Sequence, residues 1–286
     1  MLEHTAGQPR PPERVVVIGA GGFVGRAIVS RLADAGVPCL PLTRRDVDLL
    51  GDGAAKTLVA RLRASDSVVM VSAIAPARTA GALVQNVRMA EAVAEALAAM
   101  PLAHVIYVSS DAVYADGADP VTEGSCRQPS SFHGLMHATR ELMFETTVKA
   151  PLAILRPSLL YGPGDPHNGY GPNRFRRLAA KGQPIVLFGD GEDRRDHVFI
   201  DDVGAITSRV LAHRSRGVLN VATGVSVSFR EVADMIAIRT PVEIKGSPRQ
   251  NPVGHRYFDV TACLKAFPTF RYTTLADGLE RSRGEA

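Results

Sequence analysis

Short, continuous apolar runs alternate along residues 14–165 with longer stretches in which apolar residues recur every three or four positions. The continuous runs predict strands at 14–19, 37–43, 67–73 and 104–110. The periodic stretches predict helices at 23–36, 54–64, 82–100 and 133–149. Strands that are apolar on both faces and alternate with helices indicate a parallel sheet covered on both sides. The pattern therefore predicts an α/β fold with a doubly wound parallel sheet.

The regular alternation ends after residue 165, and this change predicts a second, smaller lobe. Much of the remaining glycine, proline and charge lies in residues 166–194 and 223–286, which we assign to a C-terminal substrate-binding lobe. Residues 196–213 and 217–223 resemble one more helix and one more strand that return to the sheet. We therefore expect a large domain at 14–165 plus 195–222, preceded by a flexible tail at 1–13.

Composition narrows the functional classes. The 286 residues carry a net charge of +4, but the arginines are dispersed and Trp is absent, so we expect no nucleic-acid binding. No apolar run approaches the roughly 20 residues of a membrane helix, and residues 1–13 lack the apolar core of a signal peptide. Cys39, Cys126 and Cys263 are widely spaced, which fits reduced thiols in the cytoplasm better than disulfides or a metal site.

A glycine-rich turn follows the first predicted strand and opens the first predicted helix. Gly19, Gly22 and Gly25 have the spacing GxxGxxG, which permits a tight turn and brings the backbone close to a pyrophosphate at the helix N-terminus. A glycine turn without a ligand is the alternative. Because strand and helix lie where a dinucleotide fingerprint requires them, we predict a Rossmann domain that binds NAD(P).

The end of the second predicted strand bears on the choice of cofactor. NAD sites usually place an acidic residue there to bind the ribose 2′-hydroxyl, but this chain has Thr43 followed by Arg44. A guanidinium suits a 2′-phosphate, so we favour NADP over NAD; the alternative is that Arg44 and Arg45 form a solvated surface pair. Asp48 and Leu49 would then line the adenine pocket.

Four further motifs accompany the glycine turn: VIYVSSDAVYAD at 105–116, ILRPSLLYGPGD at 154–165, GDGEDRRDHVFIDDV at 189–203 and LNVATG at 219–224. With them, the chain resembles the extended short-chain dehydrogenases/reductases of the nucleotide-sugar (NAD-dependent) epimerase/dehydratase family, from about Arg14 to the C-terminal region. The resemblance implies hydride transfer at a carbon of a nucleoside-diphosphate sugar. It also implies a homodimer through the helices at 82–100 and 133–149.

The same resemblance assigns roles to individual residues. Ser110 would bind the reacting sugar hydroxyl or carbonyl, with Asp111 beside it, and Asn173, Arg195 and Arg256 would hold the substrate diphosphate. The predicted cofactor contacts are Gly19, Gly22, Phe23, Val24, Gly25, Thr43, Arg44, Asp48, Leu49, Ala73 and His137.

The predicted catalytic helix departs from this family at two positions. The family has a tyrosine that exchanges a proton with the sugar, and four residues later a lysine that holds the nicotinamide ribose and lowers the tyrosine's pKa. In SSFHGLMHATRE (130–141) these positions are His133 and His137. No tyrosine in the chain is followed by lysine at that spacing, so no shift of register restores the motif.

Three interpretations of His133 and His137 follow. A metal pair lacks a third ligand at a recognisable spacing. His133 as the acid/base is chemically reasonable because imidazole titrates at about 6.5, with neutral His137 on the cofactor ribose. In the third interpretation the protein binds its ligands but has lost most catalysis. We favour the second and expect a keto-sugar reductase or epimerase, since Ala112 replaces the second acid typical of the family's dehydratases.

Overall fold

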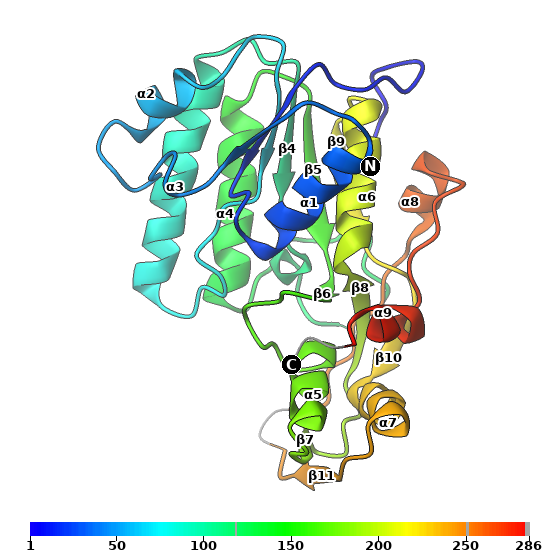
Figure 1. Cartoon of the computed structure of the whole chain (residues 1–286). Coiled ribbons are helices and arrows are strands. Elements are labelled where there is room, and N and C mark those ends of the chain that lie inside the picture. The colour runs from blue at the N-terminus through cyan, green and yellow to red at the C-terminus, as the bar shows by residue number, and fades with distance from the viewer. Residues whose placement is uncertain (118, 250–251, 284–286) are drawn as a thin grey trace.

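The computed structural model describes residues 1–117, 119–249 and 252–283. In these ranges six strands form one fully parallel sheet in the order β2-β1-β3-β4-β5-β9, drawn in the upper half of Figure 1. Their bounds are β1 (Val15–Ile18), β2 (Cys39–Leu42), β3 (Ser67–Met70), β4 (His104–Val108), β5 (Leu152–Pro157) and β9 (Gly217–Val221). The predicted α/β fold with a doubly wound parallel sheet is confirmed.

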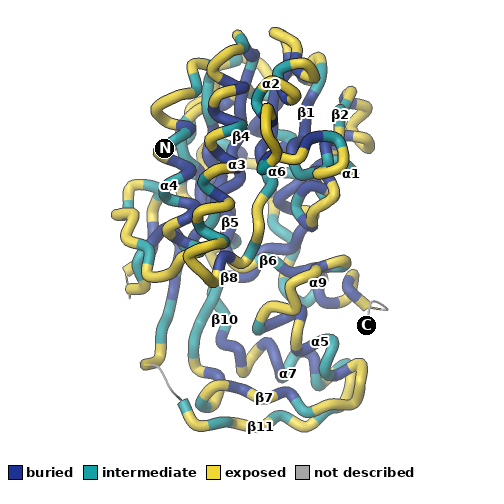
Figure 2. Tube along the Cα trace, turned by 90° about the vertical axis from the view of Figure 1, so that its left-hand side faces the viewer, coloured by how far each residue is buried: buried dark blue, intermediate teal, exposed yellow. Residues whose placement is uncertain are grey.

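Helices cover both faces of this sheet. Helices α1 (Phe23–Asp34) and α6 (Ile200–Ala212) pack together on one face. Helices α2 (Ala54–Val59), α3 (Ala80–Ala98) and α4 (Phe132–Thr147) cover the other face. β1, β3 and β4 are buried along their whole length, and β1 and β4 can be found in Figure 2 by their dark colour. Burial on both faces explains why these strands read as continuous apolar runs.

The smaller lobe lies at the carboxyl end of the sheet, in the lower half of Figure 1. It contains the sheet β10-β8-β6 and the parallel pair β11-β7. Its own apolar core lies between α5, α7, β7 and β11. The bounds are β6 (Leu159–Tyr161), α5 (Pro172–Ala180), β7 (Ile185–Phe188), β8 (Arg194–Phe199), β10 (Ser226–Ser228), α7 (Phe229–Arg239), β11 (Ile244–Ser247) and α9 (Leu275–Arg281). Helix α8 (Thr261–Ala266) packs instead on β9 of the large sheet.

One segment differs from its predicted structure. Residues 196–213 resemble a single helix in sequence, but the first four of them belong to strand β8 and the helix begins at Ile200. These residues instead pair with β6 and β10, and the buried Asp196 carboxylate accepts hydrogen bonds from the Ser158 hydroxyl, from Thr223 and from the Gly224 backbone N–H. These partners come from distant segments, so the local pattern does not reveal them.

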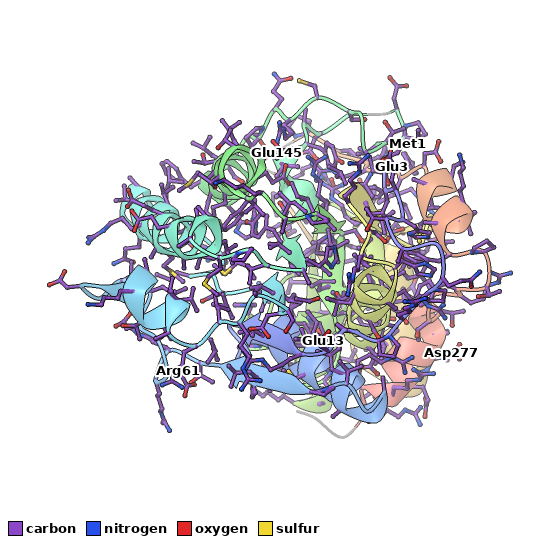
Figure 3. The ribbon with its side chains drawn as sticks, turned by 90° about the horizontal axis from the view of Figure 1, so that it is seen from above. Met1, Glu3, Glu13, Arg61, Glu145 and Asp277 are labelled. Carbon is purple, nitrogen blue, oxygen red and sulfur yellow. The ribbon has the colours of Figure 1, made fainter. Side chains whose placement is uncertain are left out.

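The N-terminal segment 1–13, which we expect to be a flexible tail, contacts the large domain. Glu3 exchanges backbone hydrogen bonds with Arg216, and its carboxylate pairs with the Arg216 guanidinium at 2.9 Å. The His4 ring stacks on His213 with the centroids 4.0 Å apart. Figure 3 shows Met1 and Glu3 on the side of α6, opposite Arg61 beside α2. Mobility of this segment stays a prediction.

The outer surfaces of α3 and α4 carry exposed apolar side chains. Val84 on α3 and Leu142 on α4 are each 56% exposed, and Leu135 is 43% exposed. The homodimer through these helices stays a prediction. Among the described residues, no helix has both the length and the apolar character needed to cross a membrane.

His104 on β4 generates a prediction about stability. The side chain is fully buried, its Nε2 lies 2.6 Å from the Ser215 carbonyl oxygen, and burial lowers its pKa to about 4. In the unfolded chain an imidazole titrates at about 6.5, so unfolding takes up a proton between these two values. This imidazole therefore contributes stability that is present above pH 6.5 and is lost as the pH falls toward 4.

We expect His104→Gln, which keeps an N–H donor for Ser215, to make the free energy of unfolding less dependent on pH. Chemical denaturation at several pH values would measure it: between pH 6.5 and 4 the variant should lose about 3 kcal/mol less of its free energy of unfolding than the wild type. His167→Gln, at an exposed position, is the matched control. Equal slopes for wild type and His104→Gln would contradict the prediction.

Candidate active site

The glycine-rich turn between β1 and α1 leaves no room for a side chain at Gly19 or Gly25. Gly19 has φ +99°, and a Cβ there would lie 2.6 Å from the Ser72 backbone nitrogen. A Cβ on Gly25 would lie 2.2 Å from the Gly19 carbonyl oxygen. Gly22 caps α1 without a side-chain hydrogen bond, and the first turn of the helix holds no acidic residue. The helix N-terminus therefore keeps its backbone N–H groups for an anion such as a pyrophosphate.

The end of β2 carries charges of both signs. Arg44 is 80% exposed in its side chain and pairs loosely with Asp48 at 3.3 Å. Asp46, which the sequence analysis did not single out, accepts hydrogen bonds from the Thr43 backbone N–H and hydroxyl, and these bonds lower the pKa of its carboxyl. Leu49, which follows Asp48, is buried. The guanidinium of Arg44 is thus free of close packing. The carboxylate of Asp46, by contrast, is held by its hydrogen bonds to Thr43.

Helix α4 approaches the short 3-10 helix η1 (Asp111–Val113) very closely. A Cβ on Gly134 would lie 2.0 Å from the Ala112 carbonyl oxygen, so glycine is required at this contact. Ser110 caps η1, its hydroxyl oxygen accepting the Ala112 backbone N–H at 3.1 Å. The contact brings the end of β4, which leads into Ser110 and Asp111, close to the first turn of α4, which carries His133. Burial lowers the pKa of the His133 ring, and the Asp111 carboxylate partly opposes this shift.

The two histidines are neighbours on α4. Their rings meet edge to face with the centroids 4.8 Å apart, and the His137 Nδ1 lies 2.7 Å from the Tyr107 hydroxyl. Burial lowers the pKa of His133 despite Asp111, and burial together with the charge of a protonated His133 lowers that of His137 far more. Burial also raises the pKa of Tyr107 to about 12. At neutral pH the group is therefore two uncharged imidazoles and a phenol.

A buried carboxylate anchors the middle of α4. Glu141 accepts the Ser109 hydroxyl at 2.6 Å and a bidentate pair of bonds from Arg156 at 2.9 and 2.7 Å. Arg127 adds a third cationic contact at 3.1 Å. Sequence reasoning missed this set because its members come from four separate segments. Charge-assisted, bidentate bonds of this kind fix the helix relative to β4 and β5.

The residues predicted to hold a diphosphate are engaged within the protein. Arg256 is buried and pairs with Asp111 at 2.9 Å and Asp116 at 2.7 Å. Arg195 donates to the Gly254 carbonyl at 2.7 Å and lies 3.8 Å from Asp116. The two guanidiniums therefore converge on one exposed carboxylate, as a shared anion site would require.

Asn173, the third predicted diphosphate contact, is buried on the first turn of α5. Its side-chain oxygen accepts the Gly162 backbone N–H, and its amide donates to the Leu160 carbonyl. These bonds connect α5 to the end of β6.

A further arginine on this side was not predicted. Arg249 pairs with Glu192 at 2.6 Å and with Asp193 at 2.8 Å, and Asp193 also accepts the Gly254 backbone N–H. The acidic residues 190, 192 and 193 just before Arg194 were the only sequence signal for such a partner. In the described part of the chain, no group of three or more His, Cys, Asp or Glu side chains is arranged to hold a metal ion.

Comparison with known proteins agrees with this geometry. Residues 15–222 match the model of the NAD dependent epimerase/dehydratase family. The chain is 26% identical to a UDP-glucose 4-epimerase from Mycolicibacterium smegmatis, over 94% of this chain and 97% of that protein. It is 32% identical to a dTDP-4-dehydro-6-deoxy-D-allose reductase from Streptomyces bikiniensis, over 45% of this chain and 41% of that one. The crystal structure of a Thermus thermophilus UDP-glucose 4-epimerase complexed with NAD superposes with a TM-score of 0.83 at 20% identity, covering 96% and 100% of the two chains.

Gly25→Ala tests the glycine turn as the cofactor site. The added methyl must displace the Gly19 carbonyl, so we expect dinucleotide affinity, measured by calorimetry, to fall at least about tenfold and stability to fall by about 1 to 3 kcal/mol. Gly81→Ala on α3 is the control, because its Cβ would meet only the Thr79 hydroxyl at 3.9 Å. Unchanged affinity in Gly25→Ala would show that the dinucleotide binds elsewhere.

Proposed function

This chain belongs to the NAD dependent epimerase/dehydratase family, and we propose that it is an NAD(P)-dependent oxidoreductase that moves hydride at a sugar carbon of a nucleoside-diphosphate sugar. The observation that carries the proposal is the meeting of Ser110, Asp111 and His133 where α4 contacts η1. We favour a keto-sugar reductase or an epimerase within this class.

The proton chemistry is assigned to His133. Its ring is uncharged at neutral pH because burial lowers its pKa, so it can accept the proton of a sugar hydroxyl while the carbon loses hydride. The Asp111 carboxylate then stabilises the imidazolium, and the Ser110 hydroxyl binds the sugar oxygen. In the direction of reduction His133 must begin protonated and return its proton to the substrate.

The cofactor would lie along the glycine turn and the carboxyl edge of the sheet. The backbone N–H groups at Phe23 to Gly25 suit its pyrophosphate. NAD(P) supplies the hydride acceptor or donor when bound. His137, held through Nδ1 by Tyr107, presents Nε2 on the opposite side of its ring, where it would contact the ribose hydroxyls.

Two observations support a nucleoside-diphosphate sugar as the substrate. The Mycolicibacterium smegmatis relative, aligned over nearly its whole length, is named for a UDP-sugar, and a second relative for a dTDP-sugar. Arg195 and Arg256 face a common carboxylate, Asp116, which a phosphate of the substrate would replace.

The same pairing also favours a second candidate function. Because Asp111 and Asp116 already neutralise Arg256, and because no lysine lies on α4, the protein would also suit a role as a nucleotide-sugar or dinucleotide binding protein with little catalysis. The two candidates differ in whether the family's tyrosine and lysine are needed for activity.

His133→Phe tests the catalytic assignment. The variant should lose roughly a hundredfold to ten-thousandfold in rate on UDP- or dTDP-sugars while still binding both ligands in calorimetry. Since the pKa of His133 is lowered, wild-type reduction should accelerate and oxidation should slow as the pH falls below about 6.5.

The double variant His133→Tyr with His137→Lys provides the contrast, because it restores the residues that the family carries. An inactive wild type together with an active double variant would reject the histidine mechanism in favour of the binding function. If the His133→Phe variant kept the wild-type rate, the acid/base would have to be another residue.

NADP preference rests on the exposed guanidinium of Arg44 and the missing acid at Thr43. Arg44→Ala should weaken NADP by about tenfold or more and leave NAD almost unchanged, since a charge-assisted bond contributes about 1.5 to 3 kcal/mol. Calorimetric titration with both cofactors measures this. Tighter binding of NAD than NADP by the wild type would overturn the preference and direct attention to Asp46.

A further inference from the structure

Arg140 on α4 is a buried cation without an acidic partner. The residue is 1% exposed, donates to the Ser72 carbonyl oxygen at 2.7 Å, and places its guanidinium carbon 5.2 Å from the centre of the Tyr107 ring. Its remaining contact is with the Met136 sulfur at 3.5 Å, and its Nε has no hydrogen-bond partner. Among the described residues no carboxylate lies within 4.0 Å of it, unlike the buried Arg156.

Such a cation is costly for the fold. Removing a charge from water without pairing it costs several kcal/mol, and stacking on an aromatic ring recovers only about 2 kcal/mol. The next residue along the chain, Glu141, cannot neutralise it because its two oxygens are committed to Arg156, Arg127 and Ser109. A guanidinium nevertheless keeps its proton at neutral pH. Packing alone therefore gives no reason for a charge at this position.

The location of Arg140 suggests what the charge acts on. His133, His137 and Arg140 follow one another at spacings of four and three residues, so they share one face of α4. The guanidinium reaches the backbone just beyond the carboxyl end of β3, next to Ala73, and ligands of open α/β sheets bind at this edge. No lysine occurs anywhere on α4, and Arg140 is the helix's one cationic side chain apart from its histidines.

We infer that Arg140 is a positioning residue. It lies three residues after His137 on α4 and supplies the fixed positive charge that, by the family resemblance, a lysine at position 137 would provide. This charge adds to the effect of burial, which already favours the unprotonated form of His133 and His137, so that His133 is ready to accept a proton. The inference rests on the proposed function only in giving His133 the proton transfer. The effect on the two rings is independent of any activity.

Other charged groups also face these rings. Asp111 on η1 opposes Arg140 by raising the pKa of His133, whereas His167 from the loop before α5 acts in the same direction as Arg140. Tyr107 on β4 faces His137 as an uncharged phenol. Arg140 differs from His167 in that its charge is permanent and buried, so solvent screens it little.

The test is an NMR titration of the full-length chain labelled at the imidazole carbons, with no substrate or cofactor required. Arg140→Gln removes the charge and keeps an N–H donor for Ser72, so the titration midpoint of His133 should rise. Arg140→Lys keeps the charge and should leave the midpoint close to the wild-type value. Arg209→Gln is the control: it removes a guanidinium on α6 that stacks on Phe270, and it should leave the His133 midpoint unchanged.

Several outcomes would overturn the inference. An unchanged His133 midpoint in Arg140→Gln would do so, and so would an equal rise in Arg140→Lys, which would indicate a change of packing. Arg140→Met, which fills the space of the arginine stem, is a second neutral variant should the glutamine not fold. A wild-type midpoint at or above 6.5 for His133 would refute the inference without any variant.

Activity provides a separate reading. If the proposed function holds, the pKa that limits oxidation on the acid side should rise in Arg140→Gln by the same amount as the NMR midpoint, and Arg140→Lys should restore it. If the wild type has no activity but the NMR midpoint still rises, the proposed function fails while the role of Arg140 stands. A shifted rate profile with an unshifted NMR midpoint would count against Arg140.

Discussion

The buried carboxylate of Glu141 is the interaction on which the geometry of the site depends. It receives Arg156 from β5, Ser109 from the end of β4 and Arg127 from the loop before α4, so one side chain connects the helix to two central strands. Removing Glu141 or Arg156 would leave the other as an uncompensated buried charge, at a cost of about 3 to 5 kcal/mol. Because α4 is fixed in this way, the residues on its first two turns have defined positions relative to the carboxyl edge of the sheet.

On this anchored helix the protein places a set of groups with unusual charge states. His133 and His137 are uncharged, Tyr107 keeps its proton, and the neighbouring guanidinium of Arg140 is charged but unpaired. For His133, His137 and Tyr107, burial shifts the pKa more than any single neighbouring group does. Low polarity around α4 thus suppresses proton binding at the imidazoles, while the exposed Asp116 and the half-buried Arg195 keep the other side of the site polar.

The sequence predicted those parts of the molecule that depend on local pattern. Continuous apolar runs identified the strands, glycine spacing identified the turn at Gly19, and helical spacing placed His133 beside His137. It did not predict strand β8, because Asp196 finds its partners in segments 27 and 38 residues away. The Glu141 cluster, the pairing of Arg249 with Glu192 and the contact of Asp46 with Thr43 were missed because they depend on side-chain conformation or on remote partners.

The close contact between Gly134 and the Ala112 carbonyl has a mechanical consequence. With no space for even one methyl group between them, α4 and η1 cannot slide or separate without breaking the packing on both sides. The serine and the imidazole that these elements carry therefore move as one rigid unit.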